Sequence, residues 1–450
     1  MVATETRTRT GQRVTLLAMC LGLFLAQVDT TAVNLALPAV GRELRGGLGA
    51  LPWVMDAYNL AFAALLLTGG TLGDRLGRRR MYRYGITAFL AGSLACAAAP
   101  TLGALIAGRV LQGAGAALAI PQSLAILSVA FPGRAERNRA MAAWSTVTGV
   151  AFAAGPTLGG LLVDRLGWAS IFWVNLPIGL AALLLTRAAP ESADPRARPV
   201  DLAGQVCAAV GLGAVTYAVT DGLRGSALVP WVVGVACLVA FVLVERRRAE
   251  PMLPLGLLRG RLATAALVAF GMTFGMYGMF MLISLDLQGE RGMSAMASGL
   301  ALMPLAVVIT FGSPLTGRLV TRFGPRPAMT WGMALMGSGL VAYALLGGDA
   351  PVPALCTVFG VIGVGLALNT GPVVGVAVAA VAPERAGLAG GIANLARMTG
   401  STLGVAVMGA VLAAGTRGAG FGHGLRWALL VGAAVELTGA AVAYRGLRRP

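Results

Sequence analysis

Two charged side chains lie deep inside long apolar stretches of this sequence. Asp29 is about 15 residues into the stretch 14–39, and Arg109 lies at a similar depth within the stretch 101–125. A charge in hydrocarbon is costly unless it is paired or hydrated. Loss of water disfavours a carboxylate charge, which suits a proton carrier, whereas a buried arginine stays charged and can hold that carboxylate ionised. We predict a proton-binding pair; a static ion pair that fixes helix packing is the alternative.

A second pair of charges occupies the last two apolar stretches, 386–413 and 425–444. Arg397 and Glu436 each lie about 11 residues inside their stretch. Asn394 precedes Arg397 by three residues and shares its helix face, so we place it on a substrate pathway. Glu436 is predicted to balance Arg397 and to bind a second proton, and a purely structural pair fits the sequence equally well.

Other polar side chains lie near the ends of apolar stretches. Trp53 and Asp56 are three residues apart on one helix face, so ring and carboxylate can hold a cation between them. Solvation at an interfacial aromatic belt explains Trp53, Asp56 and Asp286 without any ligand. We assign these three residues, together with Asn34 and Gln112, to a candidate substrate pathway.

The composition is that of a membrane protein. The chain is 57% hydrophobic and only 12% charged, about half the charged fraction of a soluble domain. Its apolar runs of about 20 residues are long enough to cross a bilayer. They lack the alternation of barrel strands, so an all-α membrane protein is predicted.

Several chemistries are excluded by what the sequence lacks. The chain has no lysine and one histidine, so the phosphate-binding motif GxxxxGK[ST], lysine Schiff bases and histidine metal clusters are ruled out. Its five cysteines lie far apart in apolar runs and are expected to be small core residues. We expect no enzyme activity, no metal and no cofactor, and no nucleic-acid partner despite the net charge of +17.

We predict fourteen transmembrane helices from the apolar runs. They are expected within residues 14–39, 51–70, 81–99, 101–125, 140–163, 169–185, 202–220, 229–244, 262–287, 297–315, 328–346, 352–376, 386–413 and 425–444. This count puts 26 arginines on one face and seven on the other, with two inside helices. By the positive-inside rule, both termini of this multi-pass protein lie in the cytoplasm, and the location is the plasma membrane.

An internal repeat divides the chain. GTLGDRLGRRR (70–80) has a weaker copy, GRLVTRFGPR (317–326), and Pro121 and Pro132 correspond to Pro372 and Pro383 at an offset of 251 residues. We predict an N-terminal six-helix bundle (1–187), a linker with two extra helices (188–261) and a C-terminal six-helix bundle (262–450). Two parallel halves are one known architecture of membrane transporters.

Five segments resemble signatures of the major facilitator superfamily, in its fourteen-helix drug:proton antiporter branch. They are AQVDTTAVNLALP (26–38), GTLGDRLGRRR (70–80), GRVLQGAGAA (108–117), GPTLGG (155–160) and FWVNLPIG (172–179). The resemblance implies a coupling role for Asp29 and Arg109. It also implies alternating access, in which the two halves rock about a substrate held between them at mid-membrane.

The hairpin 70–80 is expected to be a conformational latch. Gly73 and Gly77 allow a tight turn and a close helix approach. Asp74 is predicted either to cap the following helix or to pair with an arginine across the interface between the halves. The latch residues are Gly70, Gly73, Asp74, Arg75, Gly77 and Arg78.

The segment GPTLGG supplies Gly155, Pro156, Gly159 and Gly160. Small residues four apart let helices pack closely. In an antiporter such a stretch is expected to seal the pathway against leak, and ordinary packing in a glycine-rich chain is the alternative.

The prediction is a proton-driven exporter of lipophilic or cationic drugs, or of a secreted natural product. Its partners are a small-molecule substrate, protons and the lipid bilayer, and it is expected to act as a monomer. A proton-coupled importer or exporter of a specific metabolite is the first alternative, and a non-transporting membrane receptor or enzyme is the second.

Overall fold

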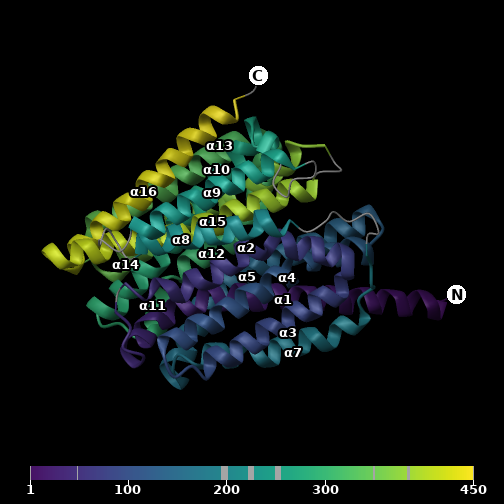
Figure 1. Ribbon diagram of the computed structural model, residues 1–450, viewed down its shortest axis with the longest axis horizontal. Helices are drawn as coiled ribbons and strands as arrows, with labels where there is room; N and C mark the ends of the chain where they lie inside the picture. The colour runs from purple at the N-terminus through teal and green to yellow at the C-terminus, as the bar shows by residue number, and fades with distance from the viewer. Residues whose placement is uncertain are drawn as a thin grey trace.

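The computed structural model describes residues 2–47, 49–193, 201–220, 228–248, 255–347, 350–382 and 386–448. Within these residues all regular structure is helical, as predicted, and the helices lie roughly along one direction (Figure 1). Of the arginines in the topology count, Arg196, Arg198, Arg224, Arg385 and Arg449 lie outside the described residues, as does Pro383 of the repeat.

Seven helices form the first part of the bundle. They are α1 (Val2–Glu43), α2 (Pro52–Leu76), α3 (Arg78–Ala97), α4 (Leu102–Ala130), α5 (Arg134–Leu166), α6 (Ser170–Trp173) and α7 (Asn175–Leu185), followed by the 3-10 turn η1 (Thr186–Ala188). Helix α4 packs against α2 and α3, and α1 packs against α5 and α7. The N-terminal end of α1 extends beyond the other helices (Figure 1).

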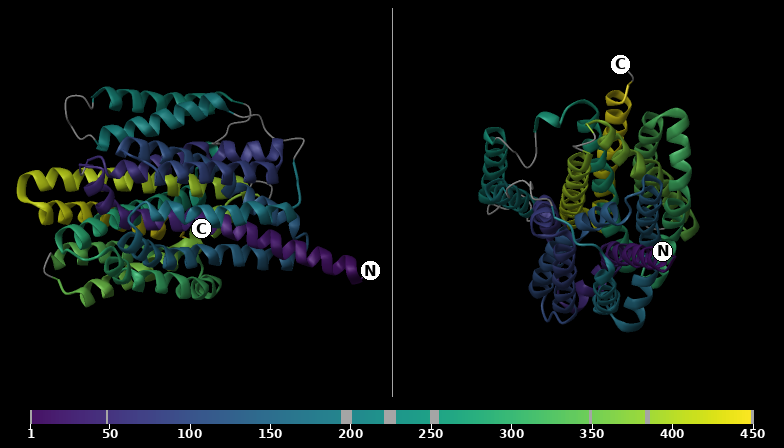
Figure 2. Two further views of the ribbon diagram at one scale, coloured as in Figure 1. Left: turned by 90° about the horizontal axis from the view of Figure 1, so that it is seen from below. Right: turned by 90° about the vertical axis from the view of Figure 1, so that its right-hand side faces the viewer.

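Two helices lie on the flank of the bundle. α8 (Leu202–Thr220) and α9 (Leu228–Arg247) pack against each other, and α8 also touches α2 and α15 (Figure 2). A 3-10 turn, η3 (Leu255–Leu257), follows them.

The remaining helices form the last part of the bundle. They are α10 (Gly260–Leu285), which continues as the π-helical turn η4 (Asp286–Glu290), α11 (Ala295–Ala301), α12 (Met303–Phe323), α13 (Pro325–Leu346), α14 (Val352–Ala379), α15 (Ala386–Ala419) and α16 (Phe421–Gly446). α10 packs against α15 and α16, and α13 packs against α14 and α16.

Each predicted span coincides with a helix, and two of the spans are broken. The sixth consists of α6 and α7, and the tenth of α11 and α12. Among the described residues, eleven helices are long and apolar enough to cross a membrane, or twelve if α5, bent by 41°, counts as one span. α2 and α3 are not among them, and α3 begins with three consecutive arginines. The total of fourteen therefore stays a prediction.

The repeat appears in the backbone as two matching turns. Gly77 joins α2 to α3 with φ +106°, and Gly324 joins α12 to α13 with φ +80°. Only glycine adopts such angles without strain. Pro121 and Pro372 likewise lie inside the corresponding helices α4 and α14. Both copies of the hairpin therefore fold in the same way.

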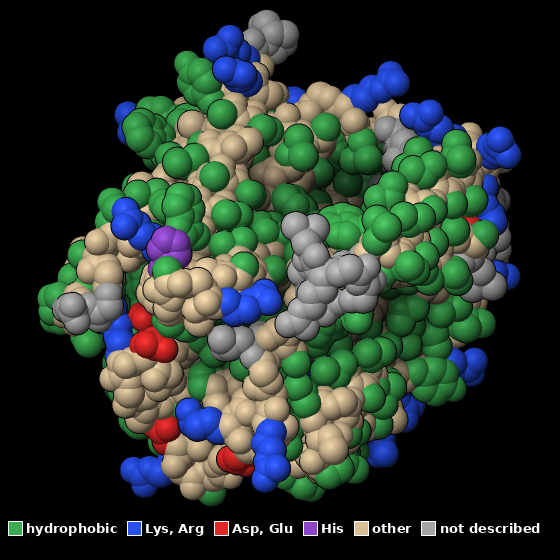
Figure 3. All heavy atoms as spheres, turned by 60° about the vertical axis from the view of Figure 1, so that its left-hand side comes forward, with side chains coloured by type: hydrophobic (Ala, Val, Ile, Leu, Met, Phe, Trp, Pro, Cys, Tyr) green, Lys and Arg blue, Asp and Glu red, His purple; other side chains and the backbone are tan. Residues whose placement is uncertain are grey.

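Apolar side chains cover broad areas of the surface, most clearly on the right of the view, where charged side chains lie mainly along the edge (Figure 3). Large residues such as Phe311, Leu228 and Val229 are about 70% exposed. Soluble proteins rarely expose contiguous apolar surface of this kind. Together with the long apolar helices, it indicates a multi-pass membrane protein.

Candidate functional site

Asp29 of α1 and Arg109 of α4 form an ion pair in the interior of the first part of the bundle. Both side chains are completely buried, and Arg109 Nη1 donates a hydrogen bond to Asp29 Oδ2. The pairing predicted from their equal depth is confirmed.

Two side-chain amides complete the environment of the Asp29 carboxylate. Gln112 Nε2 and Asn175 Nδ2 donate to Asp29 Oδ1 at 3.0 and 2.8 Å. The same two nitrogens also contact Ser93 Oγ at 2.8 and 3.2 Å. Asp29, Ser93, Arg109, Gln112 and Asn175, all at most 1% exposed, are called the Asp29 cluster below. Both oxygens of the Asp29 side chain therefore have hydrogen-bond donors, a guanidinium at one oxygen and two amides at the other.

The guanidinium of Arg109 is held on several sides. Its Nε donates to the carbonyl oxygen of Val54 at 2.9 Å, and Nη1 also donates to Gln112 Oε1 at 2.8 Å. Its central carbon lies 4.5 Å from the centre of the Tyr58 ring, a cation–π distance. Nη2 is buried and has no hydrogen-bond partner among the described residues.

Close helix packing brings the Asp29 cluster together. Arg109 and Gln112 are three residues apart and share one face of α4. A Cβ atom added at Gly92 of α3 would lie 2.7 Å from the backbone nitrogen of Gln112, so glycine is needed for this approach. The break between α6 and α7 falls at Val174, and Asn175 is the first residue after it.

Sequence reasoning missed Ser93 and Asn175. Asn175 lies within the segment FWVNLPIG, but the sequence motif alone predicts no role for its side chain. The sequence did contain a signal for Asn175. A side-chain amide within an apolar span needs hydrogen-bond partners when it is buried, so it indicates a polar cluster.

The predicted pair of Arg397 and Glu436 does not form, so that prediction is wrong. Neither residue makes an ion pair within the described chain, and both carboxylate oxygens of Glu436 are buried without a hydrogen-bond partner. Glu436 instead points at α10, since a Cβ atom on Gly275 would lie 2.2 Å from its Oε1. The backbone of α15 at Arg397 also faces α10, where Thr273 donates to the Arg397 carbonyl at 2.6 Å. Equal depth does not decide which way two helices turn their side chains.

The two outer acidic residues, Asp56 and Asp286, are buried, so the alternative of solvation at the interface is wrong. Asp286 is 2% exposed and accepts from Arg291 Nε at 2.9 Å and from the Tyr343 hydroxyl at 2.7 Å. Asp56 is completely buried, and neither of its oxygens has a partner among the described residues. The Trp53 ring lies 6.0 Å from that of Tyr217 in α8.

The remaining residues predicted to line the substrate pathway are Asn34, Asn394 and Gln112. Asn34 Nδ2 donates to the Thr30 carbonyl at 3.0 Å, while its buried Oδ1 has no partner in the described chain. Asn394 of α15 is half-buried. Gln112, as described above, belongs to the Asp29 cluster.

The latch hairpin is tightly packed at Gly73. A Cβ atom there would lie 2.0 Å from Gln122 Oε1 of α4, and Gln122 Nε2 donates to the Gly69 carbonyl at 2.7 Å. No atom lies near a Cβ built at Gly70, and Arg75 is exposed. The close approach predicted for Gly73 is confirmed, and Gly77 forms the predicted tight turn with φ +106°.

The charge of Asp74 is used locally. Arg78 Nη2, at the start of α3, lies 2.8 Å from Asp74 Oδ1, near the end of α2, so the prediction that Asp74 either caps α3 or pairs across the halves is wrong. Glu191, beyond α7, supplies the cap instead, because its carboxylate accepts from the backbone N–H groups of Arg79 and Arg80 at 2.9 and 3.2 Å. A carboxylate at a helix N-terminus is favourable.

The glycines of segment 155–160 pack against two different helices. Added Cβ atoms at Gly155 and Gly159 would collide with Thr31 and Ala32 of α1. A Cβ atom at Gly160 would lie 2.5 Å from the Ala295 carbonyl oxygen of α11, and one at Gly299 of α11 would lie 2.3 Å from that of Pro156. The predicted close packing is confirmed and joins α5 to both α1 and α11.

Asp164, one turn further along α5, caps α11. Its oxygens accept from the backbone N–H groups of Ala295 and Met296 at 3.0 and 2.8 Å. Nearby, Gln288 Nε2 donates to the Leu35 carbonyl of α1 at 3.0 Å. The first and last parts of the bundle are therefore bonded together at the end where α1 ends.

Comparisons with known proteins agree with this architecture. The family model described as Major Facilitator Superfamily matches residues 19–405 and 265–450. The chain is 40% identical over 412 residues to Multidrug resistance protein Stp of Mycobacterium tuberculosis, covering 90% of this chain and 76% of that protein. It is 35% identical over 413 residues to Drug efflux pump JefA of the same organism, covering 90% and 81%.

Among solved structures, the fold matches a bacterial homologue of the human lysosomal transporter Spinster in an inward-facing, unoccupied conformation. The TM-score is 0.70 at 18% identity, and 97% of each chain is covered. At this low identity the solved structure shows only that the fold is shared. The more similar sequences show which kind of transporter within the family the chain resembles. The chain therefore belongs to the Major Facilitator Superfamily, and its relatives place it among the drug efflux transporters of that family.

Proposed function

We propose that this chain exports lipophilic, often cationic, drugs or a secreted natural product in exchange for protons, and that Asp29 carries the proton. The observation that supports this is the Asp29 cluster, a fully buried carboxylate held by one guanidinium and two amides. A buried titratable group with a displaceable partner is what proton coupling needs.

Protonation of Asp29 would remove the negative charge that balances Arg109. The guanidinium would then lose its ion pair, while its hydrogen bonds to Val54 and Gln112 and its contact with Tyr58 would remain. Because an unbalanced buried charge is costly, the helices α1 and α4 would have to shift to solvate or re-pair it. Proton binding therefore favours a different packing of the first part of the bundle, and this difference in proton affinity between the two states is what couples the proton gradient to transport.

Asp56 is proposed as the group that attracts a cationic substrate. Its carboxylate is buried on α2, two residues from Val54, and lacks a partner among the described residues. A lipophilic cation that reached this side chain would gain an ion pair that the protein itself does not supply. The bonds of Asp164 and Gln288 close the opposite approach, so the chain is proposed to be open toward the end that carries both termini.

We place both termini in the cytoplasm, because the arginine excess lies on that face. On this view the described conformation faces inward. We further propose that the protein acts as a monomer and is driven by the proton gradient alone.

The test is efflux of a fluorescent lipophilic cation from cells that express the protein. Wild type should lower dye accumulation, and both a protonophore and Asp29→Asn should abolish this effect. Glu290→Gln removes an exposed carboxylate in the same way and should behave as wild type. If correctly inserted wild type exports none of a broad drug panel, drug export is refuted and a carrier for a specific metabolite becomes the better account.

A further inference from the structure

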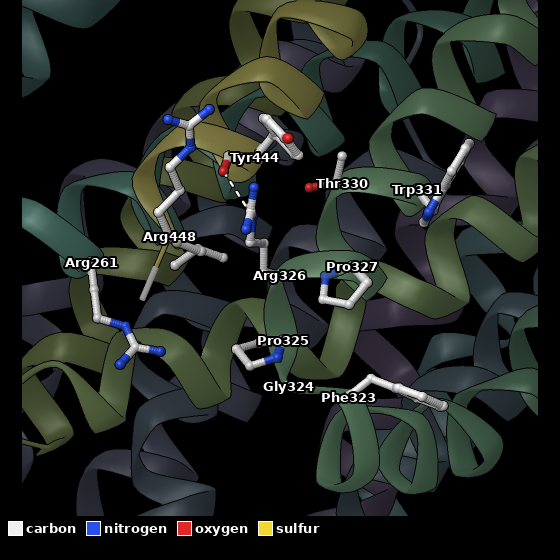
Figure 4. Close-up of a pocket in the computed structure, with 11 residues that line it drawn as sticks. Arg261, Phe323, Gly324, Pro325, Arg326, Pro327, Thr330, Trp331, Tyr444 and Arg448 are labelled. Carbon is white, nitrogen blue, oxygen red and sulfur yellow. Dashed lines mark hydrogen bonds between the residues drawn. The ribbon is translucent and has the colours of Figure 1, made fainter. Parts of the chain in front are cut away.

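A basic cavity lies where four helix ends meet, far from the Asp29 cluster in sequence. It has a volume of about 880 Å³. α10 and α13 begin beside it, and α12 and α16 end there (Figure 4). Its lining includes three arginines, Arg261, Arg326 and Arg448, but no acidic residue. Nothing in the transport mechanism uses these side chains.

Two of the arginines are organised around one tyrosine. Arg326 Nε donates to the Tyr444 carbonyl at 3.0 Å, and its guanidinium carbon lies 4.1 Å from the centre of the Tyr444 ring. The guanidinium carbon of Arg448 lies 5.3 Å from the same ring centre. Side chains that only satisfied the positive-inside rule would be free to extend into water. Both guanidiniums are instead held against the ring of Tyr444.

The cavity lacks a counter-charge. Within the described chain, none of Arg261, Arg326 and Arg448 forms an ion pair with a carboxylate. Thr330, which also lines the cavity, has a buried hydroxyl oxygen without a hydrogen-bond partner. Three guanidiniums and one hydroxyl are the donor set that suits a phosphate group, because arginine binds phosphate through paired N–H donors.

The rim of the cavity is apolar and turned outward. Trp331 is 64% exposed and Phe323 is 55% exposed. Aromatic side chains near helix ends mark the level of lipid headgroups. A ligand whose phosphate enters the cavity would therefore carry its apolar part along Trp331 and Phe323.

We propose that this cavity binds the headgroup of an anionic phospholipid. The positive charge of the three arginines is complementary to the negative charge of such a headgroup. Under the positive-inside rule, the arginine-rich end of the bundle faces the cytoplasmic leaflet. Basic pockets between transmembrane helices on that side are suited to anionic headgroups. The proposal depends on this orientation but not on the identity of the exported substrate.

The test is lipid retention by the purified full-length protein, measured by native mass spectrometry. The detergent solution contains equal amounts of phosphatidylglycerol and phosphatidylcholine with the same acyl chains. Wild type should retain phosphatidylglycerol preferentially. R326Q/R448Q should lower that preference roughly 25-fold, because each arginine near an anionic headgroup is worth about a fivefold change in binding.

A matched control removes two exposed arginines outside the cavity. R139Q/R318Q has the same net charge as R326Q/R448Q and should retain the lipid as wild type does. If R326Q/R448Q proves unstable, R448Q alone, at an exposed position near the C-terminus, should give about a fivefold loss.

Two results would overturn the proposal. One is equal retention of phosphatidylglycerol by the cavity variant and the control. The other is thermal stabilisation of wild type, but not of R326Q/R448Q, by inorganic phosphate without any preference for phosphatidylglycerol. That outcome would assign the cavity to a free phosphate.

Discussion

The side-chain amide of Asn175 donates a hydrogen bond of 2.8 Å to Oδ1 of Asp29, although 146 residues separate the two in the chain. The same amide reaches Ser93 Oγ, so one side chain links α7 to both α1 and α3. Asn175 thereby fixes the direction of the carboxylate that we propose to carry the proton, without itself binding a proton.

Replacement of Asn175 by leucine should weaken transport while leaving the protein in the membrane. The substitution removes one of the two amide donors to Asp29 Oδ1, and a buried hydrogen bond to a charged group contributes about 1.5–3 kcal/mol. We expect drug efflux to fall roughly tenfold or more. Asn369→Leu is the matched control, since Asn369 is a buried asparagine of α14 whose amide bonds the Gly365 carbonyl. Equal loss in both variants would show a general packing effect.

Arg109→Lys should abolish most proton-driven efflux although the charge is kept. The guanidinium donates at once to Asp29, Gln112 and the Val54 carbonyl, and an ammonium group on a flexible stem cannot reproduce that planar set. Transport into inverted vesicles under an imposed proton gradient gives the measurement. Arg397→Lys, in the last part of the bundle, is the comparison and should retain clearly more activity. Unchanged efflux in Arg109→Lys would show that charge alone suffices.

Glu436→Gln should fold at least as well as wild type. The carboxyl oxygens of Glu436 have no hydrogen-bond partner within the described chain, so an amide of the same shape breaks no ion pair and cannot become charged at this buried position. A thermal melt of the purified variant checks this, and a fall of several degrees would contradict it. If Glu436 also carries a proton, proton uptake per exported drug molecule should decrease. Full coupling at every pH would remove Glu436 from the mechanism.

Gly160→Ala should loosen the contact between α5 and α11. The new Cβ atom would lie 2.5 Å from the Ala295 carbonyl oxygen, which is backbone and cannot rotate away. We expect slower efflux and a passive proton leak, measured as faster dissipation of a pH gradient across proteoliposomes. Gly371→Ala on α14 has open space around its Cβ atom and should change neither quantity. If proteoliposomes with Gly160→Ala keep their pH gradient as well as wild type does, the contact between α5 and α11 is not what prevents the proton leak.

Glu191→Gln should destabilise the start of α3 by a modest amount. Its carboxylate accepts from the backbone of Arg79 and Arg80, and a charge at that position contributes about 0.3–1 kcal/mol. We expect a small fall in melting temperature and a slower transport cycle, because the hydrogen bonds between the latch hairpin and the segment after α7 are weakened. Glu136→Gln, at an exposed position in the first turn of α5, gives the reference. Identical transport kinetics in the two variants would exclude a role in transport for the hydrogen bonds of Glu191.

Much of the fold could be predicted from the sequence, because the length of an apolar run and the backbone freedom of a glycine are properties of a short stretch of chain. Apolar length predicts where helices cross a bilayer, and every predicted span contains a helix. The turn expected at Gly77 is present, because glycine accepts the left-handed backbone angle that it requires, and Gly324 turns in the same way in the second copy of the repeat. The pairing of Asp29 with Arg109 was also predictable, since two opposite charges at one depth in hydrocarbon have few other partners.

Tertiary packing decided the rest. Depth along a helix can be counted in the sequence, but the rotation of the helix about its axis depends on all of its neighbours. For this reason Glu436 faces Gly275 rather than Arg397, and Asp74 pairs within its own segment. Asn175, Glu191 and Asp164 gained partners from helices far away in the chain. Hydrogen bonds are directional and short-ranged, so contacts of this kind exist only once the helices have packed.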